Sequence, residues 1–306
     1  MTSGLPLGEK SIADRIERIP SPDEPVPAVA WPTIGLFVGG LGLWLGSSAL
    51  YLAGTWPWPI STVLNWFAAF LLFTVAHEAS HRTISTSEQL NTWLGRVAMF
   101  ILDPLAGFQL FRFVHMQHHR FTNDVASDPD YFTSHGRVLS LPLRWATIDL
   151  KYLRFYLPKL RSRPRREKIE QAISWLMLAA VVVAALETGL GFELLVLLIL
   201  PSRLALFGLG WSFDYLPHHG LPFAGRVDQF KTTRNRIGLE RLLTPALLYQ
   251  NYHLVHHLHP IIPFYRYIAV WRGNEEHYLR RDPPLTSPLG RALTVDEYRR
   301  LRQLEH

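Results

Sequence analysis

Long apolar runs without charged residues are the feature that most constrains this chain. The run from Ile34 to Ala53 carries no charge and, as a helix, is long enough to cross the hydrocarbon core of a bilayer. A second uncharged run, 60–76, continues directly into His77, and two further apolar runs lie at 172–186 and 192–213. Because only helices or closed barrels satisfy their backbone groups in lipid, these runs predict four transmembrane helices.

The stretch from Leu90 to Val114 is also apolar, but it differs from the four runs. Four residues interrupt it: Arg96, Asp103, Pro104 and Gly107. A full crossing would place charged groups in lipid, so the stretch predicts an interfacial or re-entrant helical hairpin. In the fourth run, Pro201 predicts a kink and Arg203 predicts a charge that reaches the interface. The alternative, a polar contact in a substrate passage, is less favoured.

These elements predict an all-α membrane protein with four transmembrane helices, interfacial helices and a cytoplasmic histidine-box domain. Residues 1–29, with clustered prolines and mixed charges, predict a polar N-terminal tail without a recognisable signal peptide. The membrane domain is expected over residues 30–270. Residues 271–306 predict a cytoplasmic C-terminal tail with little core of its own.

Basic residues are concentrated in one part of the chain. Nine Lys and Arg residues lie between Arg144 and Lys168, whereas the turns around Trp56 and at 187–193 contain none. Because loops rich in Lys and Arg stay in the cytoplasm, we expect both termini and the histidines to face it. This topology explains the formal net charge of +6 without a nucleic-acid partner.

The histidines are grouped at helical spacing. Of 14 histidines, eight form one HxxxH pair and two HxxHH triplets: His77, His81, His115, His118, His119, His253, His256 and His257. Residues three and four apart share one helical face. A lone histidine on an apolar helix is more often a core residue, but three grouped sets indicate metal ligation, because unpaired imidazoles are costly to bury. Eight exceed the needs of one four-coordinate ion, which favours a centre of two metal ions, and His218 with His219 adds further candidates.

Polar residues beside these clusters are candidates to accept the outer N–H groups of the ligating imidazoles. They are Asn123, Asp124, Asp128, Asp130, Asp214 and Asn251. Such acceptors usually fix the orientation of a ligating ring. For the four that follow the second cluster, an Asx turn with a helix cap is an equally good interpretation.

The order of the clusters around four spans resembles the membrane fatty-acid desaturase and hydroxylase superfamily, whose members hold two irons with histidines. The segments HMQHHRFTNDVASDPD, FDYLPHHGLPF and QNYHLVHHLHPIIPFY look like the bacterial β-carotene hydroxylases of this superfamily. The resemblance implies that the eight clustered histidines and His218 are ligands of two non-haem iron ions. It does not extend to His219, where that family usually has arginine, or to His259, where an aromatic residue is commoner.

This resemblance implies a carotenoid ring hydroxylase of the bacterial inner membrane that uses O₂ and a ferredoxin-type electron donor. Catalysis would then depend on the di-iron centre and not on a side chain, with a lipid-soluble substrate taken from the bilayer. The sequence contains no cysteine to ligate an iron–sulfur cluster, so electrons must come from a separate protein.

Two alternatives stay open. An acyl-lipid desaturase would use the same ligands, which therefore do not distinguish it from a hydroxylase. A non-catalytic metal transporter predicts ionisable residues in the middle of the spans, whereas these histidines lie at one end.

Overall fold

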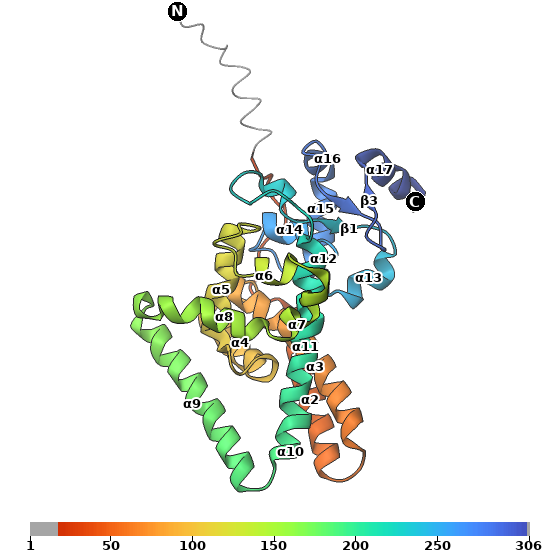
Figure 1. Cartoon of the computed structure of the whole chain (residues 1–306). Coiled ribbons are helices and arrows are strands. Elements are labelled where there is room, and N and C mark those ends of the chain that lie inside the picture. Colours follow the sequence, from red (N-terminus) through yellow and green to blue (C-terminus); the bar gives the residue numbers. More distant parts are fainter. Residues whose placement is uncertain (1–17, 305–306) are drawn as a thin grey trace, which may run out of the picture.

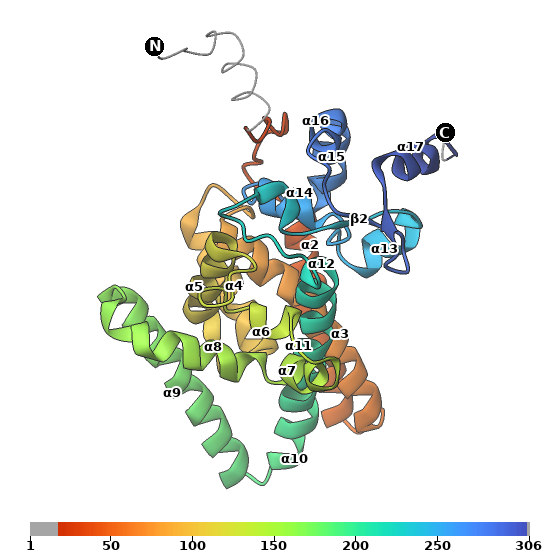
Figure 2. The ribbon, with the colours of Figure 1, turned by 45° about the horizontal axis from the view of Figure 1, so that its top comes forward.

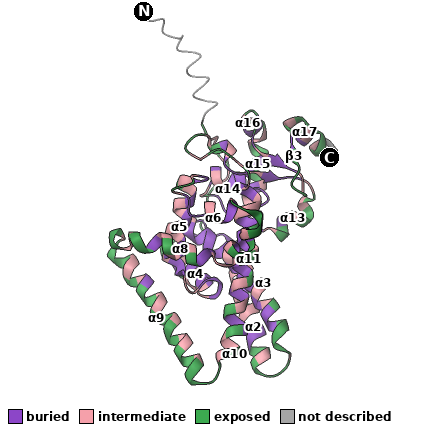
Figure 3. Cartoon of the chain, viewed as in Figure 1, coloured by how far each residue is buried: buried purple, intermediate pink, exposed green. Residues whose placement is uncertain are grey.

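Long helices extend together from one end of the molecule (Figure 1). The structure, a computed structural model, describes residues 18–304. Within that part, four helices are long and apolar enough to cross a membrane: α2 (Trp31–Leu52), α3 (Trp58–His81), α9 (Arg165–Glu187) and the composite helix Gly191–His218. The prediction of four spans is confirmed. Helix α9 stands apart and is largely exposed along its apolar length (Figure 3), as expected of a helix that faces lipid.

The composite helix contains two π-helical turns. It consists of α10 (Gly191–Leu194), a π turn at Leu195–Ile199, α11 (Leu200–Leu209), a second at Gly210–Tyr215 and α12 (Leu216–His218). The Arg203 guanidinium donates two hydrogen bonds, of 2.9 and 2.7 Å, to the buried carboxylate of Asp149 on α8 (Ile148–Tyr156). This ion pair with a residue distant in sequence was not predicted, and the position of the charge at the interface stays a prediction.

The two helices of the predicted hairpin are observed with a sharp bend between them, and their interfacial or re-entrant position stays a prediction. Helices α4 (Glu88–Leu102) and α5 (Gly107–Phe121) meet at 98° across a four-residue break. The Ser87 side chain accepts the Leu90 N–H at 3.3 Å and caps the start of α4. Gly95 allows the two helices to approach closely, because a Cβ there would lie 2.3 Å from the Phe108 ring.

Short elements cover the ends of the long helices. The remaining helices are α6 (Tyr131–Ser134), α7 (Leu141–Ala146), α13 (Glu240–Ala246), α14 (His253–Leu258), α15 (Tyr267–Gly273), α16 (Glu275–Leu279) and α17 (Val295–Leu304). A small sheet joins β1 (Asn235–Arg236) in parallel to β2 (Leu285–Thr286), and β2 pairs antiparallel with β3 (Ala292–Leu293). These C-terminal elements gather at the end of the molecule opposite α10 (Figure 2).

The chain has two apolar cores, and the second corrects a prediction. The first lies between α3, α4, α5 and α11. The second contains Trp271, Tyr278 and Tyr298, each at most 1% exposed, packed with Tyr252 and Leu254 around α14. Residues 271–304 therefore have a substantial core, contrary to the expected tail with little core. The sequence misleads here because this segment is polar overall and its few large aromatic residues are widely spaced.

The described part of the N-terminal segment lies against these C-terminal elements. The Asn274 amide donates to the Ser21 carbonyl oxygen at 2.8 Å, and the Arg266 guanidinium donates to the Pro25 carbonyl oxygen. Residues 1–17 of the expected tail lie outside the described residues.

Candidate metal centre

Four helical segments deliver the nine predicted histidines to one place. His77 and His81 occupy the last turns of α3, and the second cluster lies on the C-terminal half of α5. The third cluster forms one face of α14, and His218 ends α12. Helix α3 ends where Arg82 adopts a left-handed conformation (φ 61°), so the chain turns away directly after the HxxxH pair. The structure thus brings all nine rings together.

Five of the nine form one group. Their Nε2 or Nδ1 atoms lie within 4.8 Å of one another, in the set His77, His81, His115, His119 and His256. The Nε2 atom of His256 is 3.1 Å from that of His77 and 2.9 Å from that of His119. The Nε2 atoms of His81 and His115 are 2.8 Å apart. This group combines three helices, α3, α5 and α14.

The other four form a second group, on α5, α12 and α14. It consists of His118, His218, His253 and His257. The His253 Nε2 atom lies 3.1 Å from the Nε2 atoms of both His218 and His257. The Nε2 atoms of His118 and His257 are 3.3 Å apart. His256 and His257, adjacent in sequence, therefore belong to different groups.

The chemistry of these donor sets fits metal ions. A neutral imidazole carries one N–H and one lone pair. When several ring nitrogens converge, they cannot all form donor–acceptor pairs with one another. A cation in the middle of each group would accept every lone pair at once, and imidazole suits iron, zinc, copper and nickel. Burial, together with neighbouring histidines, holds the pKa of His253, His256 and His257 well below the ordinary value of 6.5. These rings are therefore neutral at pH 7, which is the form that binds metal.

Four of the outer ring nitrogens have hydrogen-bond partners, some of them predicted. The His118 Nδ1–H donates to Asp128 at 2.9 Å, and Asp130 lies 3.4 Å away. Three partners were not predicted: the Tyr267 hydroxyl on His256 at 2.9 Å, the Gln250 amide oxygen on His253 at 2.5 Å, and the Thr122 hydroxyl on His257 at 3.4 Å. Nothing in the sequence distinguishes these neutral hydroxyl and amide groups from the other polar residues near the clusters.

The remaining predicted acceptors do not contact an imidazole. The Asp124 carboxylate accepts the backbone N–H groups of Ala126 and Ser127, so the alternative interpretation of an Asx turn holds there. The other three bind elsewhere: Asn123 to the Phe223 and Thr232 carbonyl oxygens, Asn251 to Thr244, and Asp214 to Thr133. These amides and carboxylates position loops around the centre.

His219 and His259, to which the family resemblance does not extend, lie outside both groups. The His219 ring stacks on Tyr215, with a centroid separation of 4.3 Å, and its Nδ1 atom is 3.1 Å from the Ser134 carbonyl oxygen. His259 lies 2.7 Å from the Tyr278 hydroxyl. Neither is placed to share an ion with the nine.

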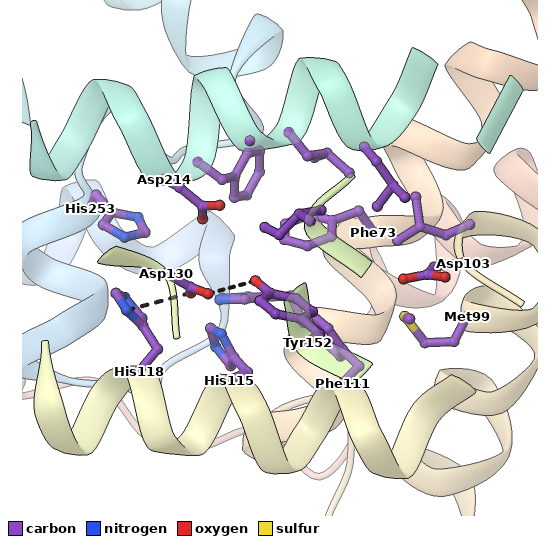
Figure 4. A pocket seen from close by; sticks show the side chains of 17 residues that line it. Phe73, Met99, Asp103, Phe111, His115, His118, Asp130, Tyr152, Asp214 and His253 are labelled. Carbon is purple, nitrogen blue, oxygen red and sulfur yellow. Dashed lines mark hydrogen bonds and ion pairs between the residues drawn. The ribbon is translucent and has the colours of Figure 1, made fainter. Parts of the chain in front are cut away.

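A narrow cavity of about 40 Å³ adjoins the histidines on the side of the long helices. Figure 4 shows His115, His118 and His253 at one end and Met99 with Asp103 at the other. Its other lining residues are mainly apolar: Phe73, Leu102, Phe111, Ile148, Leu206, Leu209 and Phe213. The Tyr152 hydroxyl donates to Asp130 at 2.7 Å and closes one wall (Figure 4). A substrate held here would meet the metal centre in apolar surroundings.

Comparison with known proteins identifies the class that this fold and site define. Residues 53–288 match the model of the fatty acid desaturase family, which is well over half of the chain. The chain belongs to this family, and its four apolar helices agree with an integral membrane oxidoreductase.

Individual relatives differ in substrate. A dihydrorhizobitoxine desaturase from Bradyrhizobium elkanii is 29% identical over 237 residues, which cover 69% of this chain and 65% of that protein. A beta-carotene ketolase from Paracoccus sp. is 29% identical over 214 residues, 66% of this chain and 74% of the ketolase. An sn-1 acyl-lipid omega-3 desaturase (ferredoxin) from Synechocystis sp. is 31% identical over 129 residues, 41% of this chain and 34% of the desaturase. The chain therefore spans less than two thirds of either desaturase.

Proposed function

We propose that this chain is a membrane-bound di-iron oxygenase that hydroxylates a carotenoid ring with O₂ and electrons from a ferredoxin-type donor. The observation that carries the proposal is the convergence of nine imidazoles, in groups of five and four, beside an apolar cavity. We assign one iron ion to each group. The likeness to a beta-carotene ketolase, over 74% of that protein, favours a carotenoid substrate.

The chain's own residues would position the substrate and protect the reaction. Bound iron supplies the activation of O₂ that attack on an unactivated C–H bond requires. Phe73, Phe111 and Phe213 would hold the end of an apolar molecule beside the histidines and exclude water from it. Met99 and Asp103 lie at the end of the cavity away from the histidines.

An acyl-lipid desaturase is the second candidate, and a specific groove favours it. A mostly apolar groove of about 560 Å³ lies between α2, the hairpin of α4 and α5, and α9. Trp44, Phe100 and Met177 line it together with Arg96 and Arg166. Apolar walls suit an acyl chain. Arg96 already pairs with Glu170, which also lines the groove, so Arg166 is the guanidinium group that would meet an anionic headgroup.

We place the protein in the bacterial inner membrane with the histidines facing the cytoplasm. The nine basic residues between Arg144 and Lys168 support this orientation, because such segments stay cytoplasmic. We also assign residues 30–270 to the membrane oxygenase domain. The segment from 271, although polar, would complete that domain by packing on α14.

Expression in a host that accumulates β-carotene tests the proposal. We expect hydroxylated carotenoids by chromatography and mass spectrometry, and none with His256→Ala, which removes a member of the five-histidine group. His277→Ala is the matched control, because His277 lies outside both groups. Unchanged pigments with new double bonds in the host's lipids would instead support the desaturase.

A further inference from the structure

A second cavity reaches the histidines, and it shares no lining residue with the apolar cavity. It is a polar cavity of about 150 Å³ lined by His119, Arg120, Thr122, Gly225, Arg226, Gln229, Thr232 and His257. His119 belongs to the five-histidine group and His257 to the four-histidine group. The opening therefore leads from the surface to both groups at once, through rings that are themselves candidate ligands.

The two arginines at this opening lack a close counter-ion. Both guanidinium groups lie over the Phe121 ring, at 5.1 Å for Arg120 and 4.5 Å for Arg226. Among the described residues, no carboxylate oxygen lies within 4 Å of either one. Asp124 lies close enough to Arg226 for an electrostatic interaction, but the Asp124 carboxylate accepts hydrogen bonds from backbone N–H groups and not from the guanidinium. Two exposed positive charges thus flank the entrance.

Exposed apolar side chains surround these charges. Val125 is 74% exposed, Val227 75% and Phe223 40%. The loop that carries the last two is held on the end of α5, because the Gly225 N–H donates to the Thr122 carbonyl oxygen at 3.0 Å and the Asn123 amide binds the loop at two carbonyl oxygens. A fixed patch of arginine and apolar residues is typical of a protein-binding surface.

We propose that this patch, defined by Arg120, Arg226, Phe223, Val125 and Val227, docks an acidic one-electron carrier protein. This inference rests on the proposed function, which needs electrons that the cysteine-free sequence cannot carry on an iron–sulfur cluster of its own. Hydroxylation of a C–H bond by O₂ consumes two electrons and two protons and releases one water, so two reduced carriers are oxidised for each product. The arginines attract the carrier's carboxylates, and the histidines in the opening provide the shortest connection from the docked carrier to the metal centre.

Binding measured in detergent solution tests this docking surface. The probe is a plant-type [2Fe–2S] ferredoxin, an acidic carrier, and the readout is the Kd for the iron-loaded protein at several salt concentrations. With Arg120→Glu/Arg226→Glu we expect Kd to rise at least tenfold at low salt and its salt dependence to flatten, because charge complementarity is lost. The matched control is Arg272→Glu/Arg300→Glu, which makes the same charge change at exposed residues that do not line the opening.

The outcomes separate this inference from the proposed function. An unchanged Kd for Arg120→Glu/Arg226→Glu, or an equal rise in the control pair, would overturn the docking surface. Iron content is measured for each variant, so that loss of the centre is not mistaken for loss of docking. Salt-dependent binding that fails only in the Arg120→Glu/Arg226→Glu variant supports the surface, even if no hydroxylated product forms and the proposed reaction is abandoned.

Discussion

Asp128 offers the sharpest test of the metal centre, because its carboxylate supports a single histidine of the four-histidine group. One oxygen accepts the His118 Nδ1–H at 2.9 Å and the Asp130 N–H at 2.9 Å, and the other accepts the Asn123 N–H at 2.7 Å. All these partners are donors. In Asp128→Asn, the N–H₂ group of the new amide must therefore face at least one of these donors. The substitution also removes the carboxylate charge that makes His118 a stronger ligand.

The expected effect is confined to one of the two groups. Loss of such a supporting carboxylate typically lowers metal affinity 10–100-fold, which corresponds to about 1.4–2.8 kcal/mol. We expect Asp128→Asn to release the first ion at a lower chelator concentration than the wild type, while the ion of the five-histidine group is retained. The assay is a chelator titration with iron counted per chain.

Asp124→Asn is the matched control for this titration. Asp124 lies in the same loop and is also an aspartate, but its partners are Ala126, Ser127 and Arg226 and include no imidazole. Its titration curve should coincide with that of the wild type. Equal loss in both variants, or equal loss of both ions in Asp128→Asn, would refute the argument that Asp128 acts through His118.

Three further predictions follow from other contacts. Tyr267→Phe removes the hydroxyl 2.9 Å from His256 and should weaken the five-histidine group about tenfold in the same titration, whereas Tyr265→Phe should not. Arg203→Met leaves the Asp149 carboxylate buried without its partner and should cost about 3–5 kcal/mol in unfolding measurements, most of it restored by adding Asp149→Asn. In thermal unfolding, the metal-free protein should lose stability as the pH falls below 6.5. The α14 histidines have lower pKa values in the folded chain than in the unfolded chain, so the unfolded chain binds more protons in this pH range. Equal stability at pH 7.5 and 5.5 would contradict this prediction.

The sequence predicts those features that depend on local periodicity. Apolar runs of helical length identify the spans, and the spacing of His115, His118 and His119 places them on one face of α5 before any tertiary contact is known. The division of the nine rings into five and four could not be predicted, because it depends on where α14 lies between α3 and α12. His256 and His257 point to different groups only in the folded chain.

Contacts between distant segments account for what the sequence did not predict. Arg203 was expected to reach the interface because a charged side chain in an apolar run usually does so. No sequence pattern near Arg203 predicts that it pairs with Asp149. Tyr267 supports His256 from beyond a turn with two prolines, where no periodic pattern links the two residues. Asp124 and Asp128 look alike in sequence, and only the fold distinguishes the turn-forming carboxylate from the one that supports a histidine.

Buried carboxylates complete the electrostatic argument for two cations at this site. Imidazole ligands contribute no negative charge, so two divalent ions would leave a buried charge of four, which is strongly unfavourable in apolar surroundings. Glu78, Asp128 and Asp130 lie beside the histidines and are each at most 5% exposed. The Glu78 carboxylate accepts the Thr83 hydroxyl at 2.9 Å and the Phe264 N–H at 3.2 Å. These contacts fix the carboxylate between His77 and His81 without making it a ligand. In the metal-free protein, Asp128 and Asp130 face the His118 ring and raise its pKa to about 9 despite burial. Once cations occupy both groups, the three carboxylates instead offset part of the charge of the cations.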